Sequence, residues 1–266
     1  MKIPFVKAHG AHNDFLLTWV AQLPGFFAAP ARARTAISIC DRHTGVGADG
    51  WILMDRLPGS DASIELWNSD GSWSEISGNG TRCAAALVVE SEIALNNVRI
   101  QTGAGPKDLR LLQRSGKSFQ FEMNMGRARV EQLESPIVPG HDSVILNVGN
   151  PQCAVLVKDF DMDWRRIGAE LEHHERFPDR TNVSFVRVLG PHTLDVRFFE
   201  RGAGETMSSG TGSTGAFAAA LACGLVESPV EVRTPAGPLQ LRLQDQNIFL
   251  AGPAEIVARG EYLFKE

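Results

Sequence analysis

Short segments rich in Val, Ile and Phe dominate the chain, and polar turns that contain Gly separate them. This pattern predicts a fold made mainly of short β-strands. We expect strands at residues 36–39, 50–54, 62–67, 109–113, 118–124, 143–148, 154–157, 183–188, 193–199, 239–243 and 247–251. Residues 82–90 and 215–223 differ, because Ala recurs in them at successive helical turns. Both are predicted to be helices that pack closely on all sides.

The two Ala-rich helices belong to an internal repeat. Residues 102–111 (TGAGPKDLRL) match residues 234–243 (TPAGPLQLRL) at seven of ten positions, 132 residues apart. The Ser-Gly-x-Gly segments at residues 77–80 and 209–212 keep the same offset. A constant offset predicts two copies of one unit of about 130 residues, the ordinary size of a domain. Each copy is expected to wrap antiparallel strands around one central helix.

Composition excludes several classes of protein. Hydrophobic residues make up 43% of the chain and charged residues 21%, which is ordinary for a globular protein. The net charge of −5 and the absence of a basic run argue against a nucleic-acid or membrane partner. With no apolar run near 20 residues and no secretory pattern at the start, we expect a cytoplasmic protein. The four cysteines lack metal-ligand spacing, so we expect no metal and four buried thiols.

The paired Ser-Gly-x-Gly loops are the first candidate site. Glycines before a helix expose backbone N–H groups, and the helix dipole adds positive potential there. Two such ends at matched repeat positions suggest a site for one anion. The alternative is that these glycines only cap and close-pack a buried helix.

The motifs resemble those of the diaminopimelate epimerase family along nearly the whole chain. The matching segments are residues 7–15 (KAHGAHNDF), 40–50 (CDRHTGVGADG), 68–71 (NSDG), 77–83 (SGNGTRC), 149–151 (GNP), 180–183 (RTNV), 200–206 (ERGAGET), 210–212 (GTG) and 252–255 (GPAE).

The resemblance implies an α/β fold of two pseudo-symmetric domains, each a curled, mainly antiparallel sheet around a central helix. It implies an N-terminal domain of residues 1–115 with a C-terminal segment from about 253 to 266. Residues 116–252 would form the second domain. The active site would lie in the cleft between the domains, use no cofactor, and place a base on each face of the substrate's α-carbon.

The resemblance also implies roles for individual residues. The backbone N–H groups that would hold the substrate α-carboxylate belong to Gly78, Asn79, Gly210 and Thr211. The residues that would bind the rest of an amino-acid-like substrate are Asn13, Asn68, Asn150, Asn182 and Arg201. Arg201 also has a physical case, because a guanidinium binds a carboxylate through two hydrogen bonds. For Asn68 and Asn150 the residues alone favour ordinary turn chemistry.

Neighbouring polar residues are expected to be structural. Asp41, Arg42, His43 and Asp49 are interpreted as parts of an ion-paired loop. His9 and His12 are interpreted as local hydrogen-bonding residues.

The chain departs from the family at its acid–base positions. Ser77 and Ser209 stand where the family has two catalytic cysteines, and Gln152 replaces a His beside the first of them. Glu200 would lie near the second base. A thiol can be tuned to exchange a proton near neutral pH, whereas a serine hydroxyl ionises far above it. We therefore expect thiol-based racemisation to be lost or severely slowed.

Three functions stay open at this point. The first is an amino-acid epimerase. The second is an isomerase or lyase that uses carboxylates, with Glu75, Glu200 and Glu205 as candidates, since relatives that make phenazines use Glu or Asp. The third is a binding protein that has kept the pocket and lost turnover. A small ligand with an α-carboxylate fits all three, and the oligomeric state, a homodimer included, also stays open.

Overall fold

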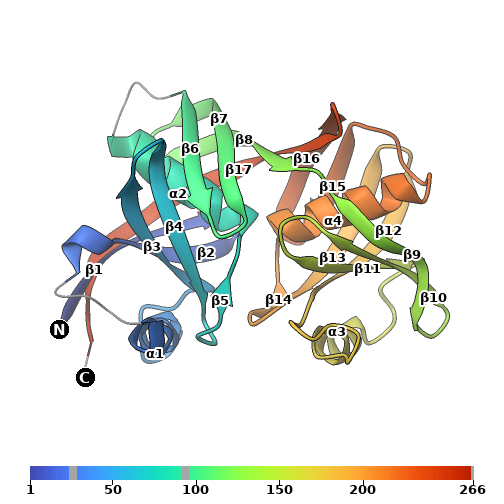
Figure 1. Ribbon diagram of the computed structural model, residues 1–266, viewed down its shortest axis with the longest axis horizontal. Coiled ribbons are helices and arrows are strands. Elements are labelled where there is room, and N and C mark those ends of the chain that lie inside the picture. Colours follow the sequence, from blue (N-terminus) through green and yellow to red (C-terminus); the bar gives the residue numbers. More distant parts are fainter. Residues whose placement is uncertain (24–28, 92–95, 265–266) are drawn as a thin grey trace. The chain divides into compact units, whose positions relative to one another are not determined.

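The computed structural model describes residues 1–23, 29–91 and 96–264, and the chain divides into two compact units (Figure 1). The first unit contains residues 1–123 and 253–266, and the second contains residues 124–252. The chain therefore passes into the second unit within strand β8 and returns within strand β17. The sequence placed the first of these crossings at residues 115/116, in the turn before β8.

The first unit is built mainly of strands. Its elements are β1 (Lys2–Gly10), β2 (Asn13–Trp19), a short 3-10 helix (Val20–Gln22), α1 (Ala29–Cys40), β3 (Gly50–Leu57), β4 (Ser60–Asn68), β5 (Trp73–Ser74), α2 (Gly78–Ser91), β6 (Asn97–Thr102), β7 (Gly105–Ser115) and most of β8 (Ser118–Gly126). The far end of β17 (Asn247–Leu263) completes it by pairing antiparallel with β1. The two chain ends lie together there, since the Met1 amino group donates to the Phe264 carbonyl at 2.7 Å.

From its first α-helix onward, the second unit has the same order of elements as the first. Three strands precede that helix, where the first unit has two strands and a 3-10 helix. The elements of the second unit are β9 (Arg129–Val138), β10 (His141–Asn147), β11 (Pro151–Val157), α3 (Trp164–Glu172), β12 (Asn182–Gly190), β13 (Thr193–Glu200), β14 (Gly204–Thr206), α4 (Gly210–Ala222), β15 (Val230–Thr234), β16 (Gly237–Gln244) and the start of β17.

Strand pairing is the same in the two units. In the first unit β3 pairs antiparallel with β4, which pairs parallel with β6, and β6 pairs antiparallel with β7. In the second unit β12, β13, β15 and β16 repeat these three pairings. Thr102 and Thr234 close equivalent turns, because their hydroxyls donate to the carbonyls of Gly105 and Gly237 at 2.7 and 2.6 Å. The repeat in the sequence is thus a repeat of strand topology.

One helix is buried in the middle of each unit, α2 in the first and α4 in the second (Figure 1). Both are rich in Ala, whose small side chain lets strands approach from several directions. The predicted α/β class, with a sheet around a central helix, is confirmed in each unit. None of the described helices is long and apolar enough to cross a membrane.

Two local predictions were wrong. Residues 36–39, expected to be a strand, form the last turn of α1, whose buried residues Thr35, Ala36, Ile39 and Cys40 follow helical spacing. The central helices begin at Gly78 and Gly210, four and five residues before their predicted starts. The helix pattern was read from Ala alone, whereas glycines also fit a first turn that a preceding serine caps.

Candidate active site

Ser77 caps the helix α2 in the first unit. Its Oγ accepts a hydrogen bond from the Gly80 N–H at 3.1 Å, and its carbonyl accepts one from the Thr81 N–H at 2.8 Å. The Oγ contact satisfies an N–H group that the helix cannot satisfy internally, and the carbonyl contact is the first hydrogen bond of the helix. Gly80 has no room for a side chain, since an added Cβ would lie 2.9 Å from the Ile52 Cδ1 atom. Ser77 and Gly80 of the Ser-Gly-x-Gly segment therefore each have a structural reason.

Ser209 caps α4 in the second unit and has a further partner. Its Oγ accepts from the Gly212 N–H at 3.0 Å and donates to Glu200 Oε2 at 2.5 Å. The other carboxylate oxygen, Glu200 Oε1, accepts from the Thr206 hydroxyl at 2.7 Å. Strands β13 and β14 form the hairpin that holds this carboxylate beside the helix end.

The two serines thus differ in the acceptor of the hydrogen bond that each hydroxyl donates. The residue 132 positions before Glu200 is Asn68, which donates to Ser72 Oγ at 3.0 Å. Within the described part of the chain, the Ser77 hydroxyl donates to no residue, and Ser77 is half-buried where Ser209 is buried. Among the described residues, a carboxylate thus accepts a hydrogen bond from the second serine and none accepts one from the first.

Buried asparagines lie next to the first turn of α2. The Asn79 side chain donates to Asn13 Oδ1 at 3.1 Å, and Asn13 donates to Asp49 Oδ2 at 2.7 Å. Arg42 forms ion pairs with Asp14 and Asp49 at 2.7 and 2.8 Å, which confirms the predicted ion-paired loop for Arg42 and Asp49. The structure thus brings Asn13 and Asn79 together, and the ion-paired loop holds Asn13 in place.

The two carboxyls of this loop are not equivalent. Burial, with the charge of Asp14 beside it, raises the pKa of Asp49. Burial also acts to raise the pKa of Asp14, but hydrogen bonds from Arg42 and Lys7 outweigh it, so this pKa is lowered. Asp14 is the carboxylate that both cations stabilise.

Gln152 and Asn150 lie beside the first turns of α4. The Gln152 Nε2 donates to Asn150 Oδ1 at 2.7 Å, and Asn150 approaches the Thr211 hydroxyl at 3.5 Å. Gln152 is buried against Gly215, where an added Cβ would lie 3.3 Å from its side chain. An amide does not titrate near neutral pH, so at this position it can orient neighbours but cannot exchange protons.

Asn182 and Arg201 form a separate pair in the second unit. Asn182 Oδ1 accepts from the Arg201 backbone N–H at 3.1 Å, and its Nδ2 donates to the Pro151 carbonyl at 3.0 Å. The Arg201 guanidinium is mostly buried and donates to the Asp179 carbonyl at 3.1 Å. The second unit therefore holds six predicted site residues in three hydrogen-bonded pairs, on or next to β11, β12, β13 and α4: Asn150 with Gln152, Asn182 with Arg201, and Glu200 with Ser209.

Comparison with known proteins shows the family of this chain. The family model for diaminopimelate epimerase matches residues 5–131 and 144–257. The diaminopimelate epimerase of Pelotomaculum thermopropionicum is 35% identical, over 98% of this chain and 99% of the relative. That of Microcystis aeruginosa is 36% identical, again over 98% and 99%. The chain belongs to the diaminopimelate epimerase family.

Solved structures with low identity show the same fold. A hydroxyproline epimerase from Agrobacterium vitis matches with a TM-score of 0.78 at 15% identity, over 98% of this chain and 92% of that one. A phenazine biosynthesis protein of the PhzF family from Bacillus anthracis matches with a TM-score of 0.72 at 14% identity, over 99% and 100%. The predicted diaminopimelate epimerase-like fold is confirmed.

The other titratable candidates make different contacts. Glu205 forms a surface ion pair with Arg165 at 2.6 Å. The carbonyl of half-buried Glu75 accepts from the Ala104 N–H at 3.1 Å. His9 accepts from the His12 N–H at 3.4 Å, the local contact expected of both. Glu200 is thus the predicted acid that contacts a serine of this diaminopimelate epimerase family member.

No thiol replaces the family's cysteines. Cys40, Cys83 and Cys153 are buried, as predicted, and burial raises the pKa of each to about 12. Cys223 was also expected to be buried, but it is half-buried, since it follows the last turn of α4. A thiol with so high a pKa is protonated at neutral pH and is a poor base.

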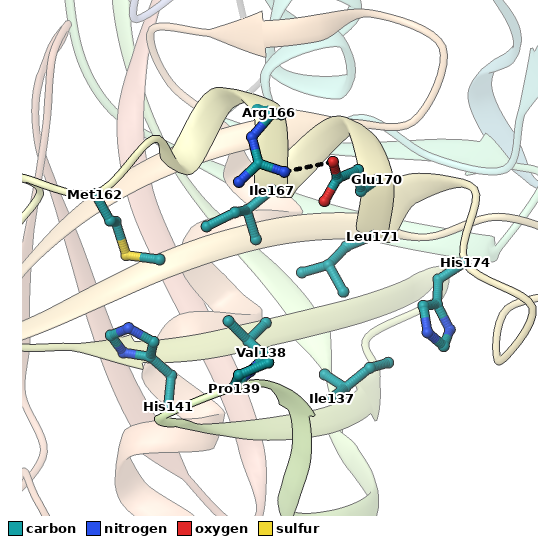
Figure 2. Close-up of a pocket in the computed structure, with 10 residues that line it drawn as sticks. All are labelled: Ile137, Val138, Pro139, His141, Met162, Arg166, Ile167, Glu170, Leu171 and His174. Carbon is teal, nitrogen blue, oxygen red and sulfur yellow. Dashed lines mark hydrogen bonds and ion pairs between the residues drawn. The ribbon is translucent and has the colours of Figure 1, made fainter.

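A cavity of about 490 Å³ opens elsewhere in the second unit. Ile167 and Leu171 on α3 face Val138 and Pro139 at the end of β9, beside an ion pair of Arg166 with a glutamate (Figure 2). None of the residues that line it is a predicted site residue. It is an apolar groove, separate from the serine-capped helix ends.

Sequence reasoning missed two residues that contact the predicted site. Thr206 donates a hydrogen bond to Glu200, and its place as the last residue of the family segment 200–206 was the available signal. Arg82 binds Asn79 from inside α2 and is fully buried. The sequence indicated no role for it beyond the start of the predicted helix 82–90.

Proposed function

We propose that this chain binds an amino acid of the diaminopimelate class by its α-carboxylate at the serine-capped ends of α2 and α4. It is by class an isomerase that acts at the α-carbon without a cofactor and interconverts LL- and meso-diaminopimelate. Proton transfer is its slow step. The reaction belongs to lysine and peptidoglycan precursor synthesis, in the cytoplasm.

The observation that carries this proposal is the matched pair of serine caps. Each serine uses the N–H groups of the third and fourth helical residues and not those of the first two. The first two N–H groups are those of Gly78 and Asn79 in α2, and of Gly210 and Thr211 in α4. Backbone N–H groups and the helix dipole favour a carboxylate at such an end. Family membership supports the same role for these positions.

In this proposal, Arg201 and the asparagines bind the far end of the ligand. A mostly buried guanidinium is suited to a second carboxylate, because two parallel hydrogen bonds fix its orientation. Asn182 supports Arg201 through its backbone. Diaminopimelate carries a second amino-acid end, which a monocarboxylic amino acid lacks.

Proton transfer is slow because hydroxyls replace thiols. Inversion at a carbon needs a proton acceptor on one face and a donor on the other. Ser77 and Ser209 ionise far above neutral pH, and Gln152 cannot accept a proton. The ligand-binding positions are kept while both bases are weakened.

Calorimetry with three ligands tests the binding part of the proposal. meso-Diaminopimelate should bind most tightly, L-lysine at least tenfold more weakly because it lacks the distal carboxylate, and pentane-1,5-diamine not measurably. The diamine is the matched control, since it keeps the chain and both amines and lacks both carboxylates. Equal binding of the diamine and meso-diaminopimelate would refute recognition through carboxylates.

A second function is favoured by one contact, the 2.5 Å hydrogen bond from Ser209 to Glu200. A carboxylate beside the serine can accept a proton on one face of a substrate. This suits an isomerase or lyase whose substrate has a carbon more acidic than the α-carbon of diaminopimelate. Glu200→Gln separates the two functions. It should abolish turnover of such a substrate, while it should change the binding of meso-diaminopimelate much less.

A further inference from the structure

Arg82 is a fully buried cation inside α2. Its Nε donates to the Pro253 carbonyl at 3.0 Å, and its Nη2 donates to Asn79 Oδ1. Its Nη1 has no hydrogen-bond partner among the described residues, and no described carboxylate pairs with it. Burial lowers the pKa of Arg82 to about 10, so the group is still charged at neutral pH. The first unit thus holds a positive charge without a matching negative one.

The guanidinium lies at the level of the first turn of α2. Side chains of a helix point back toward its N-terminus, and the hydrogen bond to Asn79 fixes this one there. Its charge therefore adds to the positive end of the helix dipole. Two positive potentials at one buried place are costly unless an anion balances them.

The nearby acidic residues do not supply that anion. Asp14 and Asp49 already have two cations of their own, Arg42 and Lys7. Two neutral amides, those of Asn13 and Asn79, separate Asp49 from Arg82. The acidic pair and its cations balance each other.

The equivalent position in the second unit is neutral. Thr214 stands 132 positions after Arg82 and donates its hydroxyl to the Gly210 carbonyl at 2.8 Å. The two helix ends are alike in their caps and differ in the charge behind them. The end of α2 is therefore the stronger electrostatic site for an anion.

We propose that Arg82 is a positioning residue for the ligand's α-carboxylate, which it attracts by its charge and aligns through Asn79. This inference rests on the proposed function, because it assigns the electrostatic part of binding to α2 rather than to α4. It predicts a ligand affinity that depends on charge at position 82 and not on the side chain at position 214.

Two variants and a matched control test the charge. Arg82→Gln keeps hydrogen-bond donors without the charge, and it should raise the Kd of meso-diaminopimelate at least tenfold. Arg82→Lys keeps the charge at low pH. Burial lowers a lysine pKa, so the affinity of this variant should fall between pH 6.5 and 9 while that of the unmodified protein stays flat. Thr214→Val, at the equivalent position, should leave the Kd unchanged.

The unfolding midpoint in urea is measured for every variant, so that a folding defect is separated from a binding defect. An unchanged Kd in folded Arg82→Gln would overturn the inference. So would a pH-independent affinity in Arg82→Lys, because a merely structural role would not follow the lysine charge.

Failure of the proposed function has a different signature. If the unmodified protein does not bind meso-diaminopimelate, acetate serves as the probe, compared with chloride at equal ionic strength. Acetate should then raise the unfolding temperature of the unmodified protein more than that of Arg82→Gln. An equal rise in both proteins would overturn the role of Arg82.

Discussion

The two serine-capped helix ends have the same hydrogen-bonded cap and differ in the charged residues around it. Ser77 stands over α2, with buried Arg82 behind it and no described acceptor for its proton. Ser209 stands over α4, with neutral Thr214 behind it and Glu200 accepting a hydrogen bond from its hydroxyl. The repeat fixed the cap in both copies, while the charges around it diverged. The buried cation thus lies behind α2, and the carboxylate lies beside the cap of α4.

This comparison also explains which changes the fold tolerates. A serine hydroxyl is a good acceptor for a helix N–H, so both caps form without a thiol. In the proposed function, the backbone of the anion site is therefore kept. Proton transfer is slowed in that proposal, because it depends on the pKa of the side chain rather than on its shape.

The largest expected effect comes from restoring acid and base on both sides. The triple change Ser77→Cys, Ser209→Cys and Gln152→His should raise the rate of α-hydrogen exchange in meso-diaminopimelate by roughly 100-fold or more. Each single change should do much less, because groups that act as one unit are strongly non-additive. NMR in deuterated water measures the rate. A triple variant that binds the ligand without exchanging would show that its α-carbon does not lie near these serines.

Arg201→Ala should weaken ligand binding by roughly 1.5–3 kcal/mol, the range for a hydrogen bond to a charged group. Calorimetry with meso-diaminopimelate measures the change, and Arg201→Lys should recover part of it. L-Lysine should lose much less affinity, since it has no distal carboxylate. Unchanged affinity for meso-diaminopimelate would remove Arg201 from the binding site.

Removing the caps should cost stability unequally. Ser77→Ala should destabilise the protein by about 1 kcal/mol, the typical cost of an N-cap. Ser209→Ala should cost roughly 1 kcal/mol more, because Glu200 also loses a donor. Urea unfolding monitored by circular dichroism compares the two. Equal losses would mean that the Glu200 contact contributes nothing to stability.

The smallest expected effect concerns the ion-paired loop beside α2. Asp14→Asn should lower the pKa of Asp49, since burial raises it and the charge of Asp14 raises it further. A carboxyl with a raised pKa contributes stability at low pH and loses it as the pH rises through that pKa, so this loss should shrink. Carbon-13 NMR of the Asp49 carboxyl follows the titration. Asp41→Asn, at an exposed position of the same loop, is the control and should leave it unchanged.

Much of the fold could be predicted because the repeat is visible in sequence. The 132-residue offset located both caps and both Thr-closed turns, and strand composition located the sheet around them. Residues 36–39 were misjudged because Ile favours strands when its neighbours are ignored. Propensity was outweighed there by burial of one helical face.

Less of the site could be predicted from residues alone. The resemblance marked Ser209 and Glu200, but only the structure gives their 2.5 Å contact. The sequence did not reveal that Arg82 is buried. Charged residues are almost always exposed, and a sequence carries no direct record of burial. The predicted cleft between the two domains stays a prediction.

The central claim is that this chain keeps a diaminopimelate site and has lost efficient proton transfer. Exchange of the α-hydrogen in the unmodified protein tests it most directly, in deuterated water with LL- or meso-diaminopimelate at concentrations that calorimetry shows to be saturating. We predict saturable binding with exchange at least roughly 100-fold slower than in the triple variant. Brisk exchange and interconversion of the two isomers by the unmodified protein would contradict the account.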